Sequence, residues 1–132
     1  MTGRREASRP PVRLLLTEGD PSLRRVLFLA LRVHGYQVTL AESADTAVEM
    51  AGHEHPDLIV LDHGLPGAID AIPALRHATF RPILLLTWPL EPGMQAALDA
   101  GADDILIKPF GINQLLQRLQ SLGAAAPPST QI

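Results

Sequence analysis

Residues 56–67 of the chain read P-D-L-I-V-L-D-H-G-L-P-G, and this stretch decides the fold. Its segment 57–61 is an almost continuous apolar run, as expected for a strand that is buried on both faces of a parallel sheet. Asp62 follows the run directly, and a turn rich in glycine and proline comes next. The stretch therefore predicts a buried strand that presents an aspartate at its carboxyl end.

Four more short apolar runs lie on either side of this strand, and stretches with helical patterns alternate with them. The five strand candidates are residues 12–17, 37–41, 57–61, 82–87 and 104–107. The helix candidates run from Asp20 to Gly35, from Ser43 onward, and within 68–78, 93–100 and 113–122. Five strands that alternate with five helices predict an α/β fold with a doubly wound parallel sheet, (βα)5.

The first helix candidate has the clearest start and stop signals. Asp20 precedes Pro21, which predicts an N-cap followed by a proline at the first helical position. Gly35 is expected to end the helix. The buried face is expected to consist of the apolar residues Leu23, Val26, Leu27, Ala30 and Leu31.

Ligands and chemistry collect at the carboxyl ends of the strands in such a sheet, so the residues that follow each strand are the candidates for a site. The four candidate segments are Glu18-Gly19-Asp20, Asp62-His63-Gly64, Thr87-Trp88 and Lys108-Pro109-Phe110. Lys108 is the only lysine in the chain. Carboxylates, a hydroxyl and the lysine amine from four separate segments are thus predicted to meet at one edge.

Length and composition limit the remaining possibilities. The 132 residues fit one domain, predicted as residues 12–122, between a flexible basic arm at 1–11 and a flexible tail at 123–132. The chain has no cysteine, and its net charge of −3 argues against a general nucleic-acid surface. No apolar run is long enough for a membrane span, so we expect a cytoplasmic protein without membrane contact.

The motifs resemble the receiver domain of response regulators in bacterial two-component signalling. The matching segments are L-L-L-T-E-G-D-P-S-L-R-R at 14–25, P-D-L-I-V-L-D-H-G-L-P-G at 56–67, P-I-L-L-L-T at 82–87 and A-G-A-D-D-I-L-I-K-P-F at 100–110. The resemblance covers about residues 12–122 and implies the strand order 2-1-3-4-5 of flavodoxin-like folds.

The resemblance also implies roles for single residues. Asp62 matches the aspartate that accepts a phosphoryl group from a histidine kinase or phosphotransfer protein, and Lys108 and Thr87 match the residues that contact the phosphoryl oxygens. Glu18, Asp62 and the backbone of Gly64 match ligands of Mg²⁺. The family implies a phosphoacceptor signalling domain rather than an enzyme, with at most self-catalysed phosphorylation and dephosphorylation.

Several positions depart from the family pattern. Gly19 stands where a second acidic residue normally binds Mg²⁺ directly, so we expect a weak or missing metal site. Asp20 is an alternative ligand, although its use as a helix cap already explains it. Trp88 replaces a small residue beside Thr87, where an indole can cover Asp62, turn outward as a docking residue or fill a surface gap. Ile105 stands where an aromatic switch residue is usual.

Pro109 follows Lys108 in a Lys-Pro bond that is usually cis in the family.

The remaining motifs carry weaker hypotheses. His53, His55 and His63 suggest zinc, but without cysteines or a tight ligand spacing we expect solvated histidines instead. A flavin-binding protein is disfavoured because the loop after the first strand lacks a hydroxyl-rich phosphate cradle.

Two functions therefore stay open. The first is a stand-alone receiver in a phosphorelay, which is phosphorylated on Asp62 and signals by contact with a downstream protein. The alternative is a pseudo-receiver that binds partners independently of phosphorylation, because Gly19 and Ile105 degrade the metal site and the switch. A homodimer through residues 93–100, the fifth strand and residues 113–122 is a further hypothesis.

Overall fold

The computed structural model describes residues 10–89 and 91–125. Positions 1–9 of the predicted basic arm and 126–132 of the predicted tail lie outside these residues. Within the described part, five strands and five helices alternate along the chain, as predicted. The strands are β1 (Arg13–Thr17), β2 (Gln37–Ala41), β3 (Leu58–Asp62), β4 (Ile83–Thr87) and β5 (Asp104–Ile107). The helices are α2 (Pro21–Val33), α3 (Ala44–Glu54), α4 (Ala68–Ala78), α5 (Met94–Ala100) and α6 (Ile112–Ala125).

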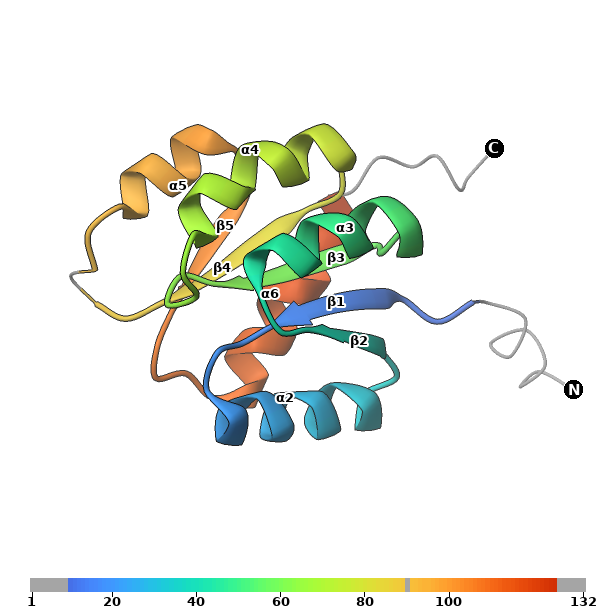
Figure 1. Cartoon of the computed structure of the whole chain (residues 1–132). Helices are drawn as coiled ribbons and strands as arrows, with labels where there is room; N and C mark the ends of the chain where they lie inside the picture. The colour runs from blue at the N-terminus through green and yellow to red at the C-terminus, as the bar shows by residue number, and fades with distance from the viewer. Residues whose placement is uncertain (1–9, 90, 126–132) are drawn as a thin grey trace, which may run out of the picture.

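All five strands are parallel and form one sheet in the order β2-β1-β3-β4-β5 (Figure 1). This confirms the predicted fold class and strand order. The helices α3, α4 and α5 cover one face of the sheet, whereas α2 and α6 cover the other (Figure 1). The order reverses between β1 and β3, so their carboxyl ends flank the topological switch point, where sites form in this class of sheet.

Alternation along the strands divides the core into two layers. In β3, Ile59 and Leu61 pack under α3, α4 and α5, whereas Leu58 and Val60 pack against α2 and α6. Successive side chains of a strand point to opposite faces of the sheet, so a strand covered on both faces has to be apolar throughout. This is why the run 57–61 reads as continuously apolar rather than alternating.

The local start signals act as expected. The Asp20 carboxylate caps α2 by accepting a hydrogen bond from the N–H of Ser22 at 2.9 Å, and Ser43 caps α3 through the N–H of Thr46 at 3.0 Å. Gly35, just beyond α2, has a φ of +94°, a conformation that glycine adopts without strain. Pro73 lies inside α4, and the helix nevertheless runs on through Ala78.

Several element ends differ from the prediction: β1, β3 and β4 each begin one residue later than expected, and α6 begins one residue earlier. β3 includes Asp62, because this residue pairs with Leu86 of β4, and its N–H also donates to the hydroxyl of Thr17 on β1. α6 continues through Ala125, past the boundary expected at Leu122. Alanines after Gly123 are good helix formers, so the glycine does not end this helix.

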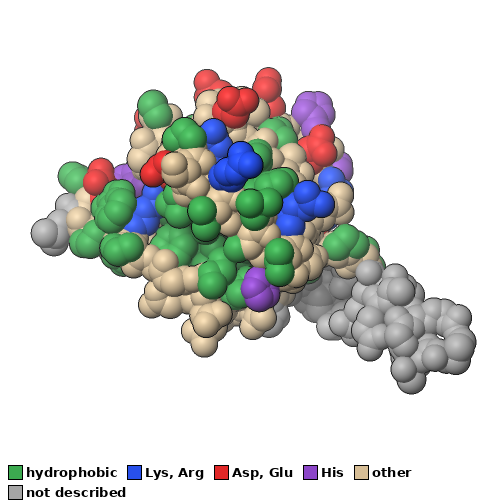
Figure 2. Space-filling model, turned by 90° about the horizontal axis from the view of Figure 1, so that it is seen from below, with side chains coloured by type: hydrophobic (Ala, Val, Ile, Leu, Met, Phe, Trp, Pro, Cys, Tyr) green, Lys and Arg blue, Asp and Glu red, His purple; other side chains and the backbone are tan. Residues whose placement is uncertain are grey.

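The outer surface of α2 differs from the expected burial. Leu27 and Leu31 are buried as predicted, but Val26 is 61% exposed, and Leu29 and Val33 are exposed with it. Seen from the side on which α2 lies, hydrophobic side chains gather between arginines (Figure 2). The prediction for Val26 was wrong because α2 carries apolar residues around most of its circumference, so its periodicity does not single out one face.

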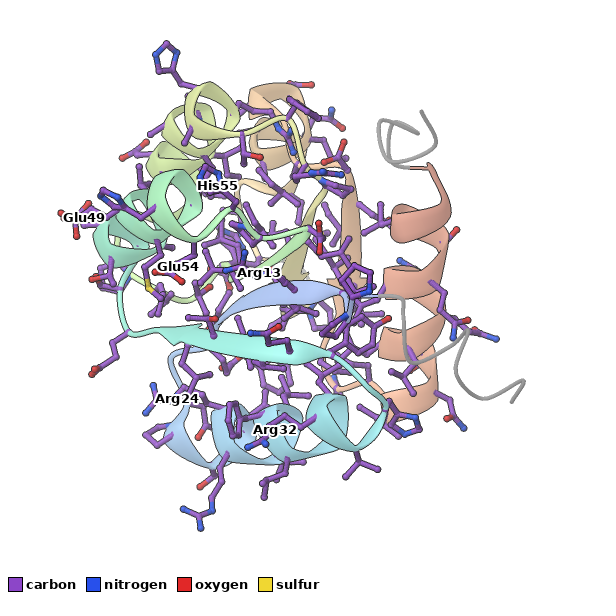
Figure 3. The ribbon with its side chains drawn as sticks, turned by 90° about the vertical axis from the view of Figure 1, so that its right-hand side faces the viewer. Arg13, Arg24, Arg32, Glu49, Glu54 and His55 are labelled. Carbon is purple, nitrogen blue, oxygen red and sulfur yellow. The ribbon has the colours of Figure 1, made fainter. Side chains whose placement is uncertain are left out.

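Charged side chains tie β1 to the edge of the α3 layer at the amino end of the sheet. Arg13 pairs with Glu54 at the end of α3, with 3.6 Å between Nη2 and Oε1 (Figure 3). The N–H of Arg13 also donates to the Asp57 carboxylate at 2.8 Å.

Among residues 10–89 and 91–125, no helix has the length and apolar character needed to cross a membrane.

Candidate functional site

The structure brings three charged side chains together at the carboxyl edge of the sheet. Lys108, after β5, places its Nζ 3.1 Å from Asp62 Oδ1 at the end of β3. The same Nζ lies 3.1 Å from Oε2 and 3.0 Å from Oε1 of Glu18, which follows β1. Glu18 is 1% exposed, and Asp62 and Lys108 are each 5% exposed. Three of the four segments predicted to meet at this edge are therefore joined by direct contacts between charged side chains.

Backbone N–H groups complete the surroundings of the Asp62 carboxylate. The N–H of Gly19 donates to Oδ2 at 2.9 Å, and the N–H of Gly64 donates to Oδ1 at 2.9 Å. The Thr17 hydroxyl donates to the carbonyl of Val60 at 3.0 Å and accepts from the N–H of Asp62 at 3.1 Å. Both oxygens of Asp62 are thus hydrogen-bonded, and the end of β3 is fixed to β1.

These contacts set the charge of Asp62. Burial by itself raises the pKa of a carboxyl, because it disfavours the ionised form. The hydrogen bonds from the Gly19 and Gly64 N–H groups, together with the charge of Lys108, outweigh burial and hold the pKa of Asp62 below its ordinary value. Asp62 is therefore an ionised carboxylate at neutral pH, which is the form that can act as a nucleophile.

At Glu18, the effects that raise the pKa of the carboxyl outweigh those that lower it, the reverse of Asp62. Burial raises the pKa of its carboxyl above the ordinary value, and the hydrogen bonds from the Asp20 N–H and Lys108 offset only part of this effect. Its Oε1 faces the lysine, but no donor among the described residues gives this atom a well-directed hydrogen bond. A buried carboxylate oxygen with spare acceptor capacity can accept a further cationic or donor group.

The donor set offers only part of a magnesium site. Mg²⁺ is usually held by one or two carboxylates and keeps several water ligands, so Glu18, whose Oε1 has spare acceptor capacity beside Lys108, and Asp62 fit such an ion. Gly19 supplies an N–H instead of a third carboxylate, and Asp20 uses its Oδ1 to cap α2. Among the residues that the structure describes, no three acidic, histidine or cysteine side chains form a metal cluster.

Thr87 lies at the end of β4, as expected. Its hydroxyl contacts His63, a residue to which the sequence assigned no role at this site. Thr87 Oγ1 is 2.8 Å from Nδ1 of His63 and 3.3 Å from the carbonyl oxygen of Trp88. Its backbone carbonyl accepts a hydrogen bond from the N–H of Lys108 at 2.7 Å. Thr87 is therefore tied to the lysine segment through the backbone, while its side chain bonds to His63.

Trp88 extends over the lysine from the solvent side. Its ring centroid lies 5.8 Å from Lys108 Nζ, within the range of a cation–π contact, and the indole is half-exposed. The indole therefore contacts the Lys108 ammonium, and more than half of the residue stays exposed to solvent. The indole also adds to the stabilisation of the lysine charge.

The two other switch candidates lie where the sequence placed them. Ile105 of β5 is half-buried and packs against the core layer under α3, α4 and α5. The peptide bond between Lys108 and Pro109 is cis, as the resemblance implied. An aliphatic side chain at position 105 has no polar atom to exchange between two hydrogen-bonded positions.

Two participants were not found from the sequence. The Gly19 N–H was missed because only side chains were considered as donors to Asp62. His63 was considered only as a zinc ligand, together with His53 and His55, which are exposed. The signal for His63 was its place one residue beyond β3, next to the end of β4 in the sheet order.

Comparison with known proteins agrees with this geometry. The family model of the response regulator receiver domain matches residues 14–120. The transcriptional regulatory protein KdpE of Mycobacterium tuberculosis is 37% identical over 111 residues, covering 82% of this chain and 49% of that protein. The KDP operon transcriptional regulatory protein KdpE of Escherichia coli is 42% identical over 110 residues, covering 81% and 49%. The chain thus spans about half the length of the curated relatives it matches.

Solved structures show the same likeness. The receiver domain of sensor histidine kinase PA1611 from Pseudomonas aeruginosa, determined with a magnesium ion in its active site cleft, matches with a TM-score of 0.77 and 32% identity. The match covers 88% of this chain and all of that domain. The strand order, the buried Asp62–Lys108 pair and these matches all point to one family. The chain belongs to the response regulator receiver domains of two-component signalling.

Proposed function

We propose that this receiver domain accepts a phosphoryl group on Asp62 from a histidine kinase or phosphotransfer protein. The observation that supports this most directly is the 3.1 Å contact between Lys108 Nζ and Asp62 Oδ1 in a buried setting. It pairs an ionised carboxylate with the cation that a transferred phosphoryl group requires. The family consists of signalling domains rather than classical enzymes, and any catalysis here is the domain's own phosphorylation and dephosphorylation.

The chemistry uses groups already in place. An oxygen of Asp62 forms a bond to phosphorus as the bond between phosphorus and the donor breaks, and the product is an acyl phosphate. Negative charge spreads over the three other phosphoryl oxygens in the transition state, which calls for cations and donors around them. Lys108 and the N–H groups of Gly19 and Gly64 already surround the carboxylate, so each can move its hydrogen bond to a phosphoryl oxygen.

Magnesium is the family's usual cofactor, and we propose that it binds weakly here. When bound, the ion neutralises charge on the phosphoryl oxygens. Glu18 and Asp62 would hold it, with the backbone of Gly64 as a further candidate. Lys108 contacts both carboxylates and competes with the ion for them.

Incubation with Mg²⁺ and acetyl phosphate, or with a cognate kinase, followed by intact-mass measurement tests the proposal. The expected result is a gain of one phosphoryl group that is lost in Asp62→Asn. Asp99→Asn is the matched control, because Asp99 is exposed on α5 and bonds only to Gln95 among the described residues. Equal gain in both variants would place the modification elsewhere.

A pseudo-receiver is the second candidate. Gly19 favours it, because glycine has no side chain at the position where the family usually has a metal-binding carboxylate. In this case the domain binds its partner with or without phosphorylation. The absence of any mass gain with small donors and kinases, with unchanged partner binding in Asp62→Asn, would support this alternative over the first.

The signal is proposed to pass by protein contact, through the surface formed by α5, β5 and α6. Leu98 and Ile107 expose apolar side chains there, which suits contact with a downstream protein or a second copy of the chain. The downstream partner, the stand-alone organisation and the cytoplasmic location stay predictions of the sequence.

A further inference from the structure

We propose that His63 is a positioning residue that holds the Thr87 hydroxyl in the resting protein and competes for it with any phosphoryl group bound at Asp62. The competition rests on the proposed function, whereas the resting contact does not. Neither the family roles nor the zinc hypothesis uses His63 in this way. Three observations support the inference: the placement of the contact, the number of hydrogens available to it, and the position of the second ring nitrogen.

The placement follows from the register of the sheet. Asp62 pairs with Leu86 across β3 and β4, and the N–H of His63 donates to the Leu86 carbonyl at 2.8 Å. The next residues along the two strands, His63 and Thr87, are therefore held side by side. Nδ1 and Oγ1 lie 2.8 Å apart, Thr87 is fully buried and His63 is half-buried.

The hydroxyl has a single hydrogen, and this makes the contact a competition. When the His63 ring carries its hydrogen on Nε2, Nδ1 accepts the hydrogen of Thr87, and the hydroxyl has none left for a phosphoryl oxygen. When Nδ1 carries a hydrogen, it donates to Oγ1, and the hydroxyl can donate elsewhere, as it does to the Trp88 carbonyl at 3.3 Å. Because the hydroxyl has one hydrogen, Nδ1 of His63 at 2.8 Å and a phosphoryl oxygen at Asp62 compete for it.

The other ring nitrogen faces the turn before α5. A Cβ at Gly93 would lie 3.5 Å from Nε2 of His63, so the ring occupies the space next to this glycine. Gly93 is the N-cap of α5 and has a φ of +96°. The ring thus lies between Thr87 and the turn before α5, and His63 can thereby transmit the state of Thr87 to α5, a role that Ile105 cannot take.

The resting contact is tested first, without phosphorylation, by ¹⁵N NMR of the ring nitrogens of the five histidines. His63→Asn identifies the His63 signals by their loss. Thr87→Val, which replaces the hydroxyl by a methyl group of similar size, is expected to shift the Nδ1 signal of His63 and leave the other histidines unchanged. A His63 spectrum that is identical in Thr87→Val would overturn the inference.

The competition is tested by the rate of phosphorylation with acetyl phosphate in three variants of His63. His63→Leu fills the space without a hydrogen bond, and His63→Gln places its amide at the position of Nε2. Both should react about fivefold faster, the factor that corresponds to one net hydrogen bond of about 1 kcal/mol. His63→Asn places its amide at the position of Nδ1 and should stay near the wild-type rate.

The outcomes separate the inference from the proposed function. Equal rates in all four proteins, or equal changes in the Asn and Leu variants, would overturn the inference and leave phosphorylation at Asp62 intact. In the Thr87→Val background, His63→Leu should have no further effect, and a persistent effect would also count against it. If no protein accepts a phosphoryl group, the proposed function fails, and the NMR comparison alone decides whether His63 holds Thr87.

Discussion

Lys108 balances two buried carboxylates, so its removal has a large predicted effect. In Lys108→Met, Glu18 and Asp62 keep their burial but lose the cation that contacts both. Leaving a buried charge without its partner costs about 3–5 kcal/mol, so the free energy of unfolding should fall by about that amount. Urea denaturation at pH 7 measures it. Adding Glu18→Gln removes one of the two stranded charges and should recover part of the loss, whereas an unchanged midpoint in Lys108→Met would contradict the prediction.

Glu18 predicts a dependence of stability on pH. Its pKa in the folded protein lies above the ordinary value of 4.5, so above that pH the unfolded chain releases a proton that the folded protein retains. Stability therefore falls as the pH rises from 4.5 through the folded pKa. In Glu18→Gln this loss should be absent, and its free energy of unfolding relative to wild type should rise with pH in that window.

Denaturant titrations of the two proteins at a series of pH values measure this difference. Asp62, whose pKa is lowered, acts in the opposite sense. Its contribution is lost as the pH falls below its ordinary value of 3.8, and it is present in both proteins. A difference between the two proteins that stays constant above pH 4.5 would show that Glu18 has an ordinary pKa.

Gly19 determines the number of carboxylates available to a metal. Gly19→Asp keeps the backbone N–H and adds a carboxylate beside Asp62, so Mg²⁺ should bind at least about tenfold more tightly. The new Cβ would lie 3.3 Å from Asp62 Oδ2 and from Leu65 Cδ2, which requires a shift of these atoms by a few tenths of an ångström.

The fluorescence of Trp88 follows the titration, because it is the only tryptophan and its ring lies 5.8 Å from Lys108 Nζ. Gly19→Asn has the same size without the charge and serves as the control. An equal gain in the Asn and Asp variants would rule out a new carboxylate ligand.

At the scale of elements, substitutions of Asp20 distinguish its role as the N-cap of α2 from its alternative role as a ligand of Mg²⁺. Asp20→Ala removes the acceptor for the Ser22 N–H and should lower the free energy of unfolding by about 1 kcal/mol. Asp20→Ser keeps a capping oxygen but no carboxylate, so both its stability and its Mg²⁺ affinity should stay near wild type. Chemical denaturation and metal titration of the two variants measure this. Weaker Mg²⁺ binding in Asp20→Ser would instead identify the carboxylate as a ligand.

The elements also show where periodicity works and where it fails. Strands β2 and β5 begin and end at the predicted residues, whereas the other three strands differ from the prediction by one residue at one or both ends. The buried face of α2 was partly wrong, because Val26, Leu29 and Val33 continue the apolar pattern on the exposed side. Helical periodicity identifies a face only when the opposite face is polar.

At the scale of the whole molecule, the surface of α5, β5 and α6 predicts a phosphorylation-dependent dimer. Analytical ultracentrifugation with acetyl phosphate and Mg²⁺ should show a dimer for the wild type and a monomer for Ile107→Lys, which puts a charge on that surface. Val33→Lys is the matched control, since Val33 is exposed on α2, which packs on β1 and β2 at the opposite edge of the sheet from β5. A wild-type monomer at high concentration, with and without phosphodonor, would contradict the dimer.

The sequence by itself determined the fold class, the strand order through the resemblance, the caps at Asp20 and Ser43, and the strand ends that meet at one edge. These features follow from local signals: burial on both sides makes a strand apolar, and a parallel sheet brings every carboxyl end to the same side. That geometry is also why Glu18, Asp62, Thr87 and Lys108 were expected together at this edge.

Only the tertiary structure decided which atoms bond at that edge. The Gly19 N–H bonds to Asp62, and the Thr87 hydroxyl bonds to His63 rather than facing the carboxylate. Glu18 and Asp62, with similar side chains and the same lysine, have pKa values shifted in opposite directions. A hydrogen bond depends on distances and angles within tenths of an ångström, and loops from separate segments set these only when the chain has packed.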